Sequence, residues 1–572
     1  MTQGPKQIVK ATRYKVQDGD SLQSIASNAG ITWQELTKFN WGTDDPDTIN
    51  RFLREKVGCL RRTRDGNNYI FTSEDDPGII YIPEDLPNIS FPTNSTHTIR
   101  VSLPDNQTFV AGECYVDFRP KPGWTGEYGF DWMRINGDYD IPVAPNIGNE
   151  EFKNIIGHYY IMVNPGCLGR MLFQSPSKQI LSDGNEYGTD DQFEKDPALV
   201  DRLKRDEYKN SFPEADSVEY SDGTRIENFT SYLSIYVNDT DLPAPRSAEI
   251  TAQLFVKQPP EEIQFRVINP SLQSKITIDP PSIANPSEQK LQLNITCQEA
   301  IDEDAIIKAV SVYRDATGES KEKIVGQLIV VANSKPHRKI KKILMVEVIV
   351  PATSDRGELS PISNPVMNPS AQRDFIRKIM NQALIDPEFH NETLDLTTTG
   401  SVFTTDFSRF EIRNNALIAY KAGDSSYPDL AGFCYRKLKD KLNSSQYDGD
   451  EYIKAFYFNV RVGMIKADGR YGGLNGYQTS DSNHNLFVVI TGTSIESTAV
   501  HEFLHALGLP HSFDGVKNWF PDQASMPYAY QAKRTENILD YTHHRGTSHY
   551  RSRIGLWHWQ WRIANSHGQT EV

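Results

Sequence analysis

The segment from Ser494 to Ser512, SIESTAVHEFLHALGLPHS, carries histidines and a glutamate at spacings that suit a metal centre. His501 and His505 are four residues apart, so on a helix both imidazoles leave one face, about one turn from each other. Two imidazole nitrogens presented in this way can bind one Zn²⁺ ion. Glu502 follows the first histidine directly, where its carboxylate can take a proton from a metal-bound water. The pattern predicts a hydrolytic site with one catalytic Zn²⁺.

A glycine and a third histidine extend the pattern. Gly508 predicts the end of the helix, because glycine adopts a left-handed backbone conformation at little cost. The turn at Leu509-Pro510 then brings His511 back toward the metal as a third ligand. Three protein ligands leave a fourth position for water, which is typical of a catalytic zinc site. The alternative, an amphipathic helix with two surface histidines, does not account for Gly508 or His511.

This extended motif, HExxHxxGxxH, resembles that of the metzincin clan of zinc endopeptidases, and the resemblance covers residues 337–572. It implies a metalloendopeptidase that acts on a protein or peptide substrate. The clan also has a turn beneath the zinc that contains methionine, followed in several families by a tyrosine that acts as a fifth ligand or transition-state donor. The best match is Asn537–Tyr541, in which Leu539 takes the methionine position and Tyr541 the tyrosine position. Leucine is close to methionine in volume, so we expect Leu539 to pack beneath the imidazoles.

A rival match for this turn is Ser525-Met526-Pro527-Tyr528, which retains a methionine. We favour the first match because the run Trp557–Ile563 follows it, as the clan's C-terminal helix would. Leu539 nevertheless leaves the family within the clan open. Three histidines just after the turn are interpreted as solvent-exposed or substrate-cleft side chains and not as ligands: His543, His544 and His549.

Strands and helices alternate around the histidine motif. Ile340–Val350 is an almost continuous apolar run, which is typical of a strand buried on both faces. Helices are expected near 371–384 and 429–442, and further strands at 453–460 and 486–490. This alternation predicts a mixed α/β catalytic domain over residues 335–572.

The N-terminal region shows a strand–helix–helix–strand order. A strand near Tyr14 precedes two short helices that Ser21 and Thr32 can cap, and Ile79–Pro83 can pair with the first strand. Over residues 14–40 the sequence resembles a LysM module, although the long charged stretch from Trp41 to Gly78 departs from that family. The resemblance implies binding of peptidoglycan or another N-acetylglucosamine polymer. The alternative is a docking or folding module without a sugar ligand. The candidate glycan-binding residues are Asp20, Ser21 and Asn40.

The middle of the chain is rich in short predicted strands. The run Gly123–Trp132 is interpreted as tight turns packed on aromatic side chains, with a recognition surface as the alternative. Short strands with proline-rich punctuation over 248–332 predict an immunoglobulin-like β-sandwich. The expected organisation is therefore multidomain: a small α+β LysM-like module at 1–90, a β-rich domain at 91–245, the sandwich at 246–334 and the metzincin-like domain at 335–572.

Charge, cysteine content and apolar segments limit the kinds of partner and the cellular location that we expect for this chain. The net charge of −15, from 60 basic and 75 acidic residues, would repel nucleic acid. The five cysteines are scattered, which indicates neither a disulfide framework nor a thiol-ligated metal. The N-terminus lacks the apolar core of a signal peptide, and no window approaches the ~18–20 apolar residues of a membrane span. We expect a chain made in the cytoplasm without a signal peptide.

A zinc domain joined to a LysM-like module and β-rich spacers suggests that the other modules carry the catalytic domain to its site of action. LysM-like modules occur in contractile injection devices such as the type VI secretion system. The sequence therefore indicates an effector or toxin peptidase that is secreted or injected into a target cell, with a secretion tube or spike component as a candidate partner. Two alternatives stay open: a hydrolase of peptidoglycan stem peptides, and a structural or carrier protein of the injection machine. A complete set of three histidine ligands together with the base Glu502 disfavours the carrier.

Overall fold

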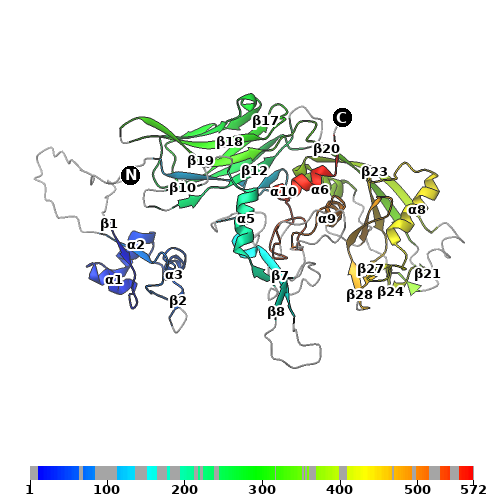
Figure 1. Cartoon of the computed structure of the whole chain (residues 1–572), viewed down its shortest axis with the longest axis horizontal. Coiled ribbons are helices and arrows are strands. Elements are labelled where there is room, and N and C mark those ends of the chain that lie inside the picture. Colours follow the sequence, from blue (N-terminus) through cyan, green and yellow to red (C-terminus); the bar gives the residue numbers. More distant parts are fainter. Residues whose placement is uncertain are drawn as a thin grey trace, which may run out of the picture. The chain divides into compact units, whose positions relative to one another are not determined.

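The structure is a computed structural model in which the chain forms two compact units, Met1–Pro104 and Asp105–Val572 (Figure 1). Each unit has its own buried apolar core. The described residues are 11–63, 68–83, 112–135, 151–163, 177–180, 193–210, 217–219, 223, 225–237, 244–315, 317–350, 353–354, 357–359, 369–397, 409–466, 469–491, 497–513, 528–541 and 553–570.

The first unit has the strand–helix–helix–strand order expected of a LysM-like module. Its outer strands β1 and β4 pair antiparallel, with Tyr14 opposite Ile80. Ser21 and Thr32 cap the first two helices, each in a capping box that satisfies the free N–H groups of the first turn. The stretch from Trp41 to Gly78 holds a third helix and a short hairpin, which the sequence did not indicate. The elements are β1 (Ala11–Lys15), α1 (Leu22–Asn28), α2 (Trp33–Trp41), α3 (Pro46–Glu55), β2 (Arg61–Arg62), β3 (Tyr69–Ile70) and β4 (Ile79–Pro83).

Two sheets of the second unit enclose a common apolar core. One has the strand order β16-β14-β18-β19-β12-β6 and the other β15-β17-β13-β5. Their bounds are β5 (Cys114–Pro120), β6 (Gly129–Asp131), β12 (Thr230–Ser234), β13 (Ser247–Val256), β14 (Glu262–Val267), β15 (Ile276–Asp279), β16 (Ser282–Ala284), β17 (Gln289–Cys297), β18 (Ala305–Arg314) and β19 (Ser320–Val330). Strands on both sides of position 245 thus share these sheets: β5 pairs with β13, and β12 pairs with β19.

The aromatic run between Gly123 and Trp132 lies in the core of these sheets. Trp124, Tyr128 and Phe130 are buried, and the Trp124 indole donates a hydrogen bond to the Tyr128 carbonyl oxygen at 3.1 Å. Because these rings are covered, the run consists of turns packed on aromatic side chains and does not form an exposed recognition surface.

A largely parallel sheet lies in the C-terminal part of the second unit. Its order is β23-β20-β26-β30-β29, with β29 antiparallel at one edge and β31 paired with β20. Ile343 and Met345 of β20 face one apolar cluster, while Leu344 and Val346 face the other. Burial on both faces explains the almost continuous apolar sequence of this strand. The bounds are β20 (Lys339–Ile349), β23 (Ile385–Asp395), β26 (Tyr452–Phe458), β29 (Gly476–Ser480), β30 (Leu486–Thr491) and β31 (Gln569–Thr570).

Helices cover both faces of the parallel sheet. Apolar residues of α6, α9 and α10 belong to the cluster on one face, and those of α8 to the cluster on the other. None of the helices in the described ranges has the length and apolar character needed to cross a bilayer. The bounds are α6 (Pro369–Met380), the 3₁₀ turn η4 (Asn381–Ala383), α8 (Leu430–Leu442), α9 (Ser497–Ala506) and α10 (His558–Ser566), beside a small sheet of β24 (Ile412–Arg413), β25 (Ala416–Lys421), β27 (Val462–Ile465) and β28 (Tyr471–Leu474).

Residues from the middle of the chain complete the core beneath α9. Phe152 packs edge-on against Tyr530 and Trp557, with ring centroids 5.3 Å and 6.1 Å away. The Gln531 N–H also donates to the Ile155 carbonyl oxygen. The remaining elements are α4 (Phe152–Ile155), β7 (Gly157–Val163), β8 (Ser177–Ile180), β9 (Phe193–Lys195), α5 (Pro197–Glu207), β10 (Ser217–Glu219), β11 (Arg225–Glu227), η3 (Pro270–Leu272), β21 (Thr353–Ser354) and β22 (Gly357–Glu358).

Candidate metal centre

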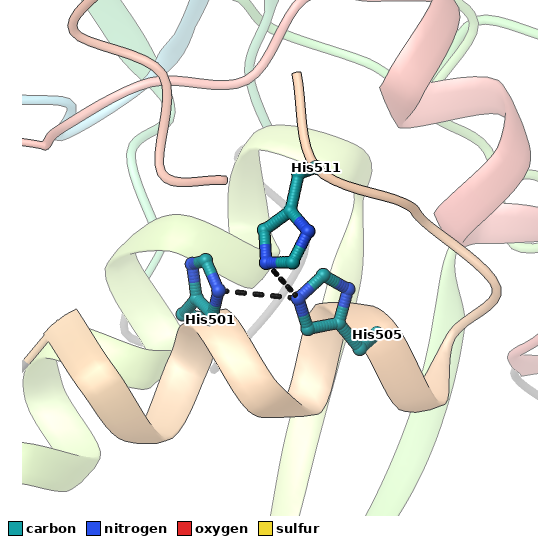
Figure 2. Close-up of side chains that lie close together, drawn as sticks. All are labelled: His501, His505 and His511. Atoms are coloured by element: carbon teal, nitrogen blue, oxygen red, sulfur yellow. Dashed lines mark hydrogen bonds between the residues drawn. The ribbon is translucent and has the colours of Figure 1, made fainter. Parts of the chain in front are cut away.

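The structure brings His501, His505 and His511 together. The first two lie one turn apart on α9, and the third comes from the segment that follows the helix (Figure 2). One ring nitrogen from each histidine lies within 4.8 Å of the other two. Nε2 of His505 is 3.1 Å from Nε2 of His501 and 3.2 Å from Nε2 of His511. The three nitrogens therefore converge on one point.

Backbone carbonyl groups orient two of these rings. Nδ1 of His501 lies 2.9 Å from the Ile538 oxygen, and Nδ1 of His505 lies 2.6 Å from the Leu509 oxygen. Since a carbonyl oxygen only accepts, each Nδ1 is assigned the proton, and each Nε2 keeps its lone pair. Lone pairs that face each other at about 3 Å repel unless a cation lies between them, and metal-binding histidines usually donate Nδ1–H to a carbonyl group in this way. The donor set therefore fits a Zn²⁺ ion.

Burial keeps the first histidine neutral. Removal of His501 from water lowers its pKa well below the ordinary range, and the charges of His505 and Arg553 lower it further. A neutral imidazole is the form that binds a metal.

Gly508 ends α9 where the sequence predicts. Its φ of +79° is left-handed, which permits the sharp reversal that returns the chain to the triad. A Cβ atom on this residue would also lie 2.9 Å from the His567 ring, so a side chain here would have to displace that exposed ring. The turn positions His511, because only Leu509 and Pro510 lie between Gly508 and that ligand.

Glu502 lies on α9 between the two helical histidines and is 8% exposed. Among the residues that the structure describes, none donates a hydrogen bond to its carboxylate, and burial raises its pKa to about 8, partly offset by Arg553. Gly476 of β29 lies against this side chain: a Cβ there would be 2.9 Å from Glu502 Cγ and 3.1 Å from Oε1. A carboxylate without fixed partners beside a metal-binding triad can accept a proton from water.

The turn at Asn537–Tyr541 lies against the triad. Besides the Ile538 carbonyl group, it contributes the Tyr541 hydroxyl, 2.9 Å from Nε2 of His511. Leu539 is fully buried in the apolar cluster that contains Val500 and Leu504 of α9. The Tyr541 hydroxyl therefore lies at the edge of the candidate metal position, where it could act as a ligand or as a donor.

The rival turn contains Met526, which lies outside the described residues. Its Tyr528 is buried in the core, with Arg202 over its ring at 5.7 Å. Of the two candidate turns, the first supplies described contacts with the histidines, through Ile538 and Tyr541. His543, His544 and His549 also lie outside the described residues.

Arg553 is a site residue that the sequence did not indicate. Its buried guanidinium donates to the Asp540 carbonyl oxygen at 3.2 Å and to Ser497 Oγ at 2.6 Å. It thereby links the start of α9 to the turn that carries Tyr541, and its Nη1 is 3.1 Å from Nδ1 of His501. No spacing rule identifies an isolated arginine of this kind, because its role depends on contacts with distant segments.

The candidate glycan-binding residues of the first unit are engaged in internal contacts. Asp20 accepts hydrogen bonds from the Tyr14 hydroxyl and the Gln17 N–H. Ser21 caps α1, and the Asn40 side chain bonds the backbone N–H and carbonyl groups of Tyr81. These side chains stabilise the module's own turns and strand pairing, so glycan contact through them stays a prediction.

Comparison with known proteins supports one part of this organisation. The chain is multidomain and rich in β-strands, with a small α/β module at its N-terminus, and residues 14–50 match the LysM domain family. No curated protein matches the chain. Among solved structures, the periplasmic chaperone SfaE is 12% identical over 19% of this chain, with a TM-score of 0.13. The match spans 61% of the chaperone's own length, and a similarity this low carries no argument about the fold.

Proposed function

We propose that the chain is a zinc-dependent endopeptidase with His501, His505 and His511 as metal ligands and Glu502 as general base. The observation that carries this proposal is the convergence of the three Nε2 atoms, two of them on rings whose Nδ1–H groups are bound by carbonyl oxygens. The buried carboxylate beside them supplies the base. Structural zinc sites usually have four protein ligands, whereas three ligands with an adjacent glutamate suit hydrolysis.

Each residue has a separate task in this proposal. Bound zinc supplies a Lewis acid that lowers the pKa of water and polarises a substrate carbonyl group. Glu502 takes the proton of the attacking water and can return it to the leaving amine. The Tyr541 hydroxyl lies 2.9 Å from Nε2 of the ligand His511 and is therefore next to the proposed metal position. There it would donate a hydrogen bond to the substrate oxygen that gains negative charge. Arg553 holds the turn and α9 in register.

The position of β29 at one edge of the largely parallel sheet favours a peptide as the substrate. Among the described strands, β29 pairs only with β30, so its outer backbone groups are available to an extended chain. The strand begins at Gly476, directly against Glu502. A peptide paired with this edge would therefore pass beside the proposed base.

Metal analysis combined with a Glu502→Gln variant tests the proposal. The variant keeps the size of the side chain but cannot accept a proton, so we expect zinc content equal to that of the wild type and casein cleavage reduced by at least ~10²-fold. His505→Ala should lose zinc and activity together. Retained cleavage in Glu502→Gln, or a purified protein without zinc whose cleavage is unaffected by chelators, would overturn the proposal.

A second candidate substrate is the stem peptide of peptidoglycan. The match of residues 14–50 to the LysM family favours it, because LysM domains bind peptidoglycan and would hold the chain on that polymer. Incubation with purified sacculi and with casein separates the two candidates. Release of stem-peptide fragments without casein cleavage would favour the peptidoglycan hydrolase.

We also propose delivery by a contractile injection system, with the chain acting as an effector or toxin. This proposal rests on the combination of a LysM module with a zinc site, as argued from the sequence. Comparison of secreted proteins from wild-type and sheath-deficient strains tests it. Equal amounts outside both strains would exclude this route. If secretion depends on the sheath but Glu502→Gln delivers the same effect, the chain is a carrier and not an effector peptidase.

A further inference from the structure

The carboxylate of Asp540 is buried in the turn that carries Tyr541. It accepts five hydrogen bonds, four of them from backbone N–H groups. Oδ1 accepts from the N–H groups of Lys533 and Tyr541, each at 2.6 Å. Oδ2 accepts from the N–H groups of Arg534 and Thr535 at 3.1 Å and 2.8 Å, and from Thr535 Oγ1 at 2.7 Å. The chemistry proposed above gives this carboxylate no task.

The segment 533–535 forms the concave backbone site that holds the carboxylate. Lys533 has a φ of +65°, a left-handed conformation that is unfavourable for a residue with a side chain. A left-handed residue in a turn can point successive N–H groups toward one anion. The hydrogen bonds to Asp540 therefore offset the strain at Lys533 and tie this segment to the turn that follows it.

The peptide group between Asp540 and Tyr541 is held at both ends. The Asp540 carboxylate accepts from its N–H, and its carbonyl oxygen accepts from Arg553 Nη1 at 3.2 Å. Because a peptide group is planar, these two contacts determine its orientation and hence the position of the next Cα atom. The Tyr541 side chain extends from that atom to place its hydroxyl 2.9 Å from Nε2 of His511. The position of this hydroxyl thus depends on the Asp540 carboxylate.

We propose that Asp540 is a positioning residue that holds the Tyr541 hydroxyl beside the metal position, which rests on the endopeptidase function proposed above. Two observations support it: the five hydrogen bonds to the carboxylate, and the second contact that Arg553 makes with the same peptide group. Asp540 acts only through Tyr541 in this role. Its substitution should therefore slow the step that the hydroxyl assists and leave the three histidine ligands in place.

Asp540→Asn tests this role in steady-state kinetics. The variant keeps the size of the side chain but has one oxygen that accepts hydrogen bonds where the carboxylate has two, so part of the set is lost. We expect kcat with a fluorogenic peptide to fall by about 10-fold, because small misplacements of reacting groups are costly, while KM and zinc content change little. Loss of zinc, or a change in KM alone, would overturn the proposal.

A double-mutant cycle with Tyr541→Phe separates positioning from a general effect on the fold. If Asp540 acts through the Tyr541 hydroxyl, Asp540→Asn should lower kcat by less than about twofold once that hydroxyl is absent. Independent effects would multiply instead, so a further loss of about 10-fold in the double variant would contradict the proposal. A wild-type kcat in Tyr541→Phe would contradict it as well.

Asp481→Asn is the matched control. Its carboxylate also holds a turn, before β30, where Oδ1 accepts from the N–H groups of Asn483 and Asn485 at 2.9 Å and 3.0 Å. We expect wild-type kinetics in this variant. A fall in kcat equal to that of Asp540→Asn would show that the kinetic effect is not specific to the turn beside the triad.

Hydrogen–deuterium exchange of the metal-free, full-length protein tests the positioning without any activity. In Asp540→Asn, the N–H groups of 533–541 that lose their acceptor should exchange roughly 10-fold faster than in the wild type, while β20 should be unchanged. Equal exchange over 533–541 in the two proteins would overturn the proposal. The measurement needs neither zinc nor cleavage, so it distinguishes failure of this role for Asp540 from failure of the endopeptidase proposal.

Thr535→Val is a milder change that tests the same contacts if Asp540→Asn does not fold. The buried Thr535 hydroxyl donates to Asp540 Oδ2 at 2.7 Å, and Thr535→Ser keeps this donor. We expect Thr535→Val to lower kcat about threefold and Thr535→Ser to remain close to the wild type. A loss in Thr535→Val that persists undiminished in the Tyr541→Phe background would show that the contacts do not act through Tyr541.

Discussion

The buried guanidinium of Arg134 donates a hydrogen bond to the carboxylate of Glu536, 402 positions later in the sequence. Arg134 also lies over the Trp132 ring at 3.9 Å. Glu536 precedes the turn that contacts the triad, and its backbone oxygen accepts from the Ile554 N–H at 2.9 Å. The middle of the chain thus anchors the segment that carries Ile538 and Tyr541.

Arg134→Met should strongly destabilise the second unit. The variant leaves Glu536 as a buried charge without its partner, a change that costs about 3–5 kcal/mol. Denaturant unfolding would measure it. Arg314→Met is the matched control, because its pair with Glu261 is exposed on both sides and contributes at most ~1 kcal/mol. Equal losses in the two variants would contradict a structural role for the buried pair.

Gly476→Ala should impair activity without releasing the metal. Its Cβ would lie 2.9 Å from Glu502 Cγ, so the proposed base must move while the three imidazoles stay in place. We expect kcat to fall by about 10-fold or more, since small misplacements of reacting groups are costly, with zinc content unchanged. Gly473→Ala in β28 is the control, because the atom nearest to its new Cβ would be the Tyr471 hydroxyl oxygen at 3.8 Å. Full activity in Gly476→Ala would show that Glu502 is not constrained by this contact.

Tyr541→Phe removes the hydroxyl that lies 2.9 Å from His511 Nε2 and keeps the ring. If this group donates to the developing negative charge, kcat should fall by about 10²-fold while KM and zinc content change little. Steady-state kinetics with a fluorogenic peptide and metal analysis would measure these effects. Tyr447→Phe, whose hydroxyl contacts Glu392, is the control with expected wild-type kinetics. A change in KM alone would assign Tyr541 to substrate binding.

Zinc should stabilise the second unit, because the converging Nε2 atoms exist only in the folded chain. At a free zinc concentration about 1,000 times Kd, binding adds about 4 kcal/mol to the free energy of unfolding. Melting curves with zinc and with a chelator would measure the shift. His505→Ala should abolish it, whereas His390→Ala, on the distant strand β23, should retain it. A shift that persists in His505→Ala would place the metal elsewhere.

Stability should depend on the ionisation of Asp131. Burial raises the pKa of this carboxyl from its ordinary 3.8 to about 6, partly offset by Arg134. The folded state holds the proton of Asp131 more tightly than the unfolded chain does. The stabilising contribution of this protonation to the free energy of unfolding is therefore complete below about pH 4 and is lost as the pH rises through about 6. Relative to Asp131→Asn, the wild type should lose about 3 kcal/mol between those limits. Chemical unfolding of both proteins across this range provides the measurement, and a constant difference would contradict the prediction.

Local sequence patterns predicted the features that depend on residues close together in the sequence. The capping residues Ser21 and Thr32 mark the starts of α1 and α2, and the left-handed Gly508 marks the end of α9. The apolar run of β20 predicts burial on both faces, which the structure confirms. Each of these features depends on nearest-neighbour geometry, so a single sequence contains enough information to find it.

Strand pairing across the middle of the chain was not predictable in this way. The pairs β5–β13 and β12–β19 join segments that the sequence assigned to different domains. Alternating apolar residues show that a strand has a buried face, but they do not show which other strand lies beside it. The long insertion before β4 likewise concealed α3 and a hairpin.

The sequence by itself determined that His501 and His505 share one face of a helix, because residues four apart lie about one turn from each other, and that Glu502 is next to the first of them. It also indicated His511 through the turn after Gly508. Only the tertiary structure decided which carbonyl groups orient the imidazoles, how Tyr541 and Arg553 meet the triad, and that Arg134 anchors their segment. Those contacts join residues far apart in the chain, and their geometry follows from the packing of the whole second unit and not from any local period.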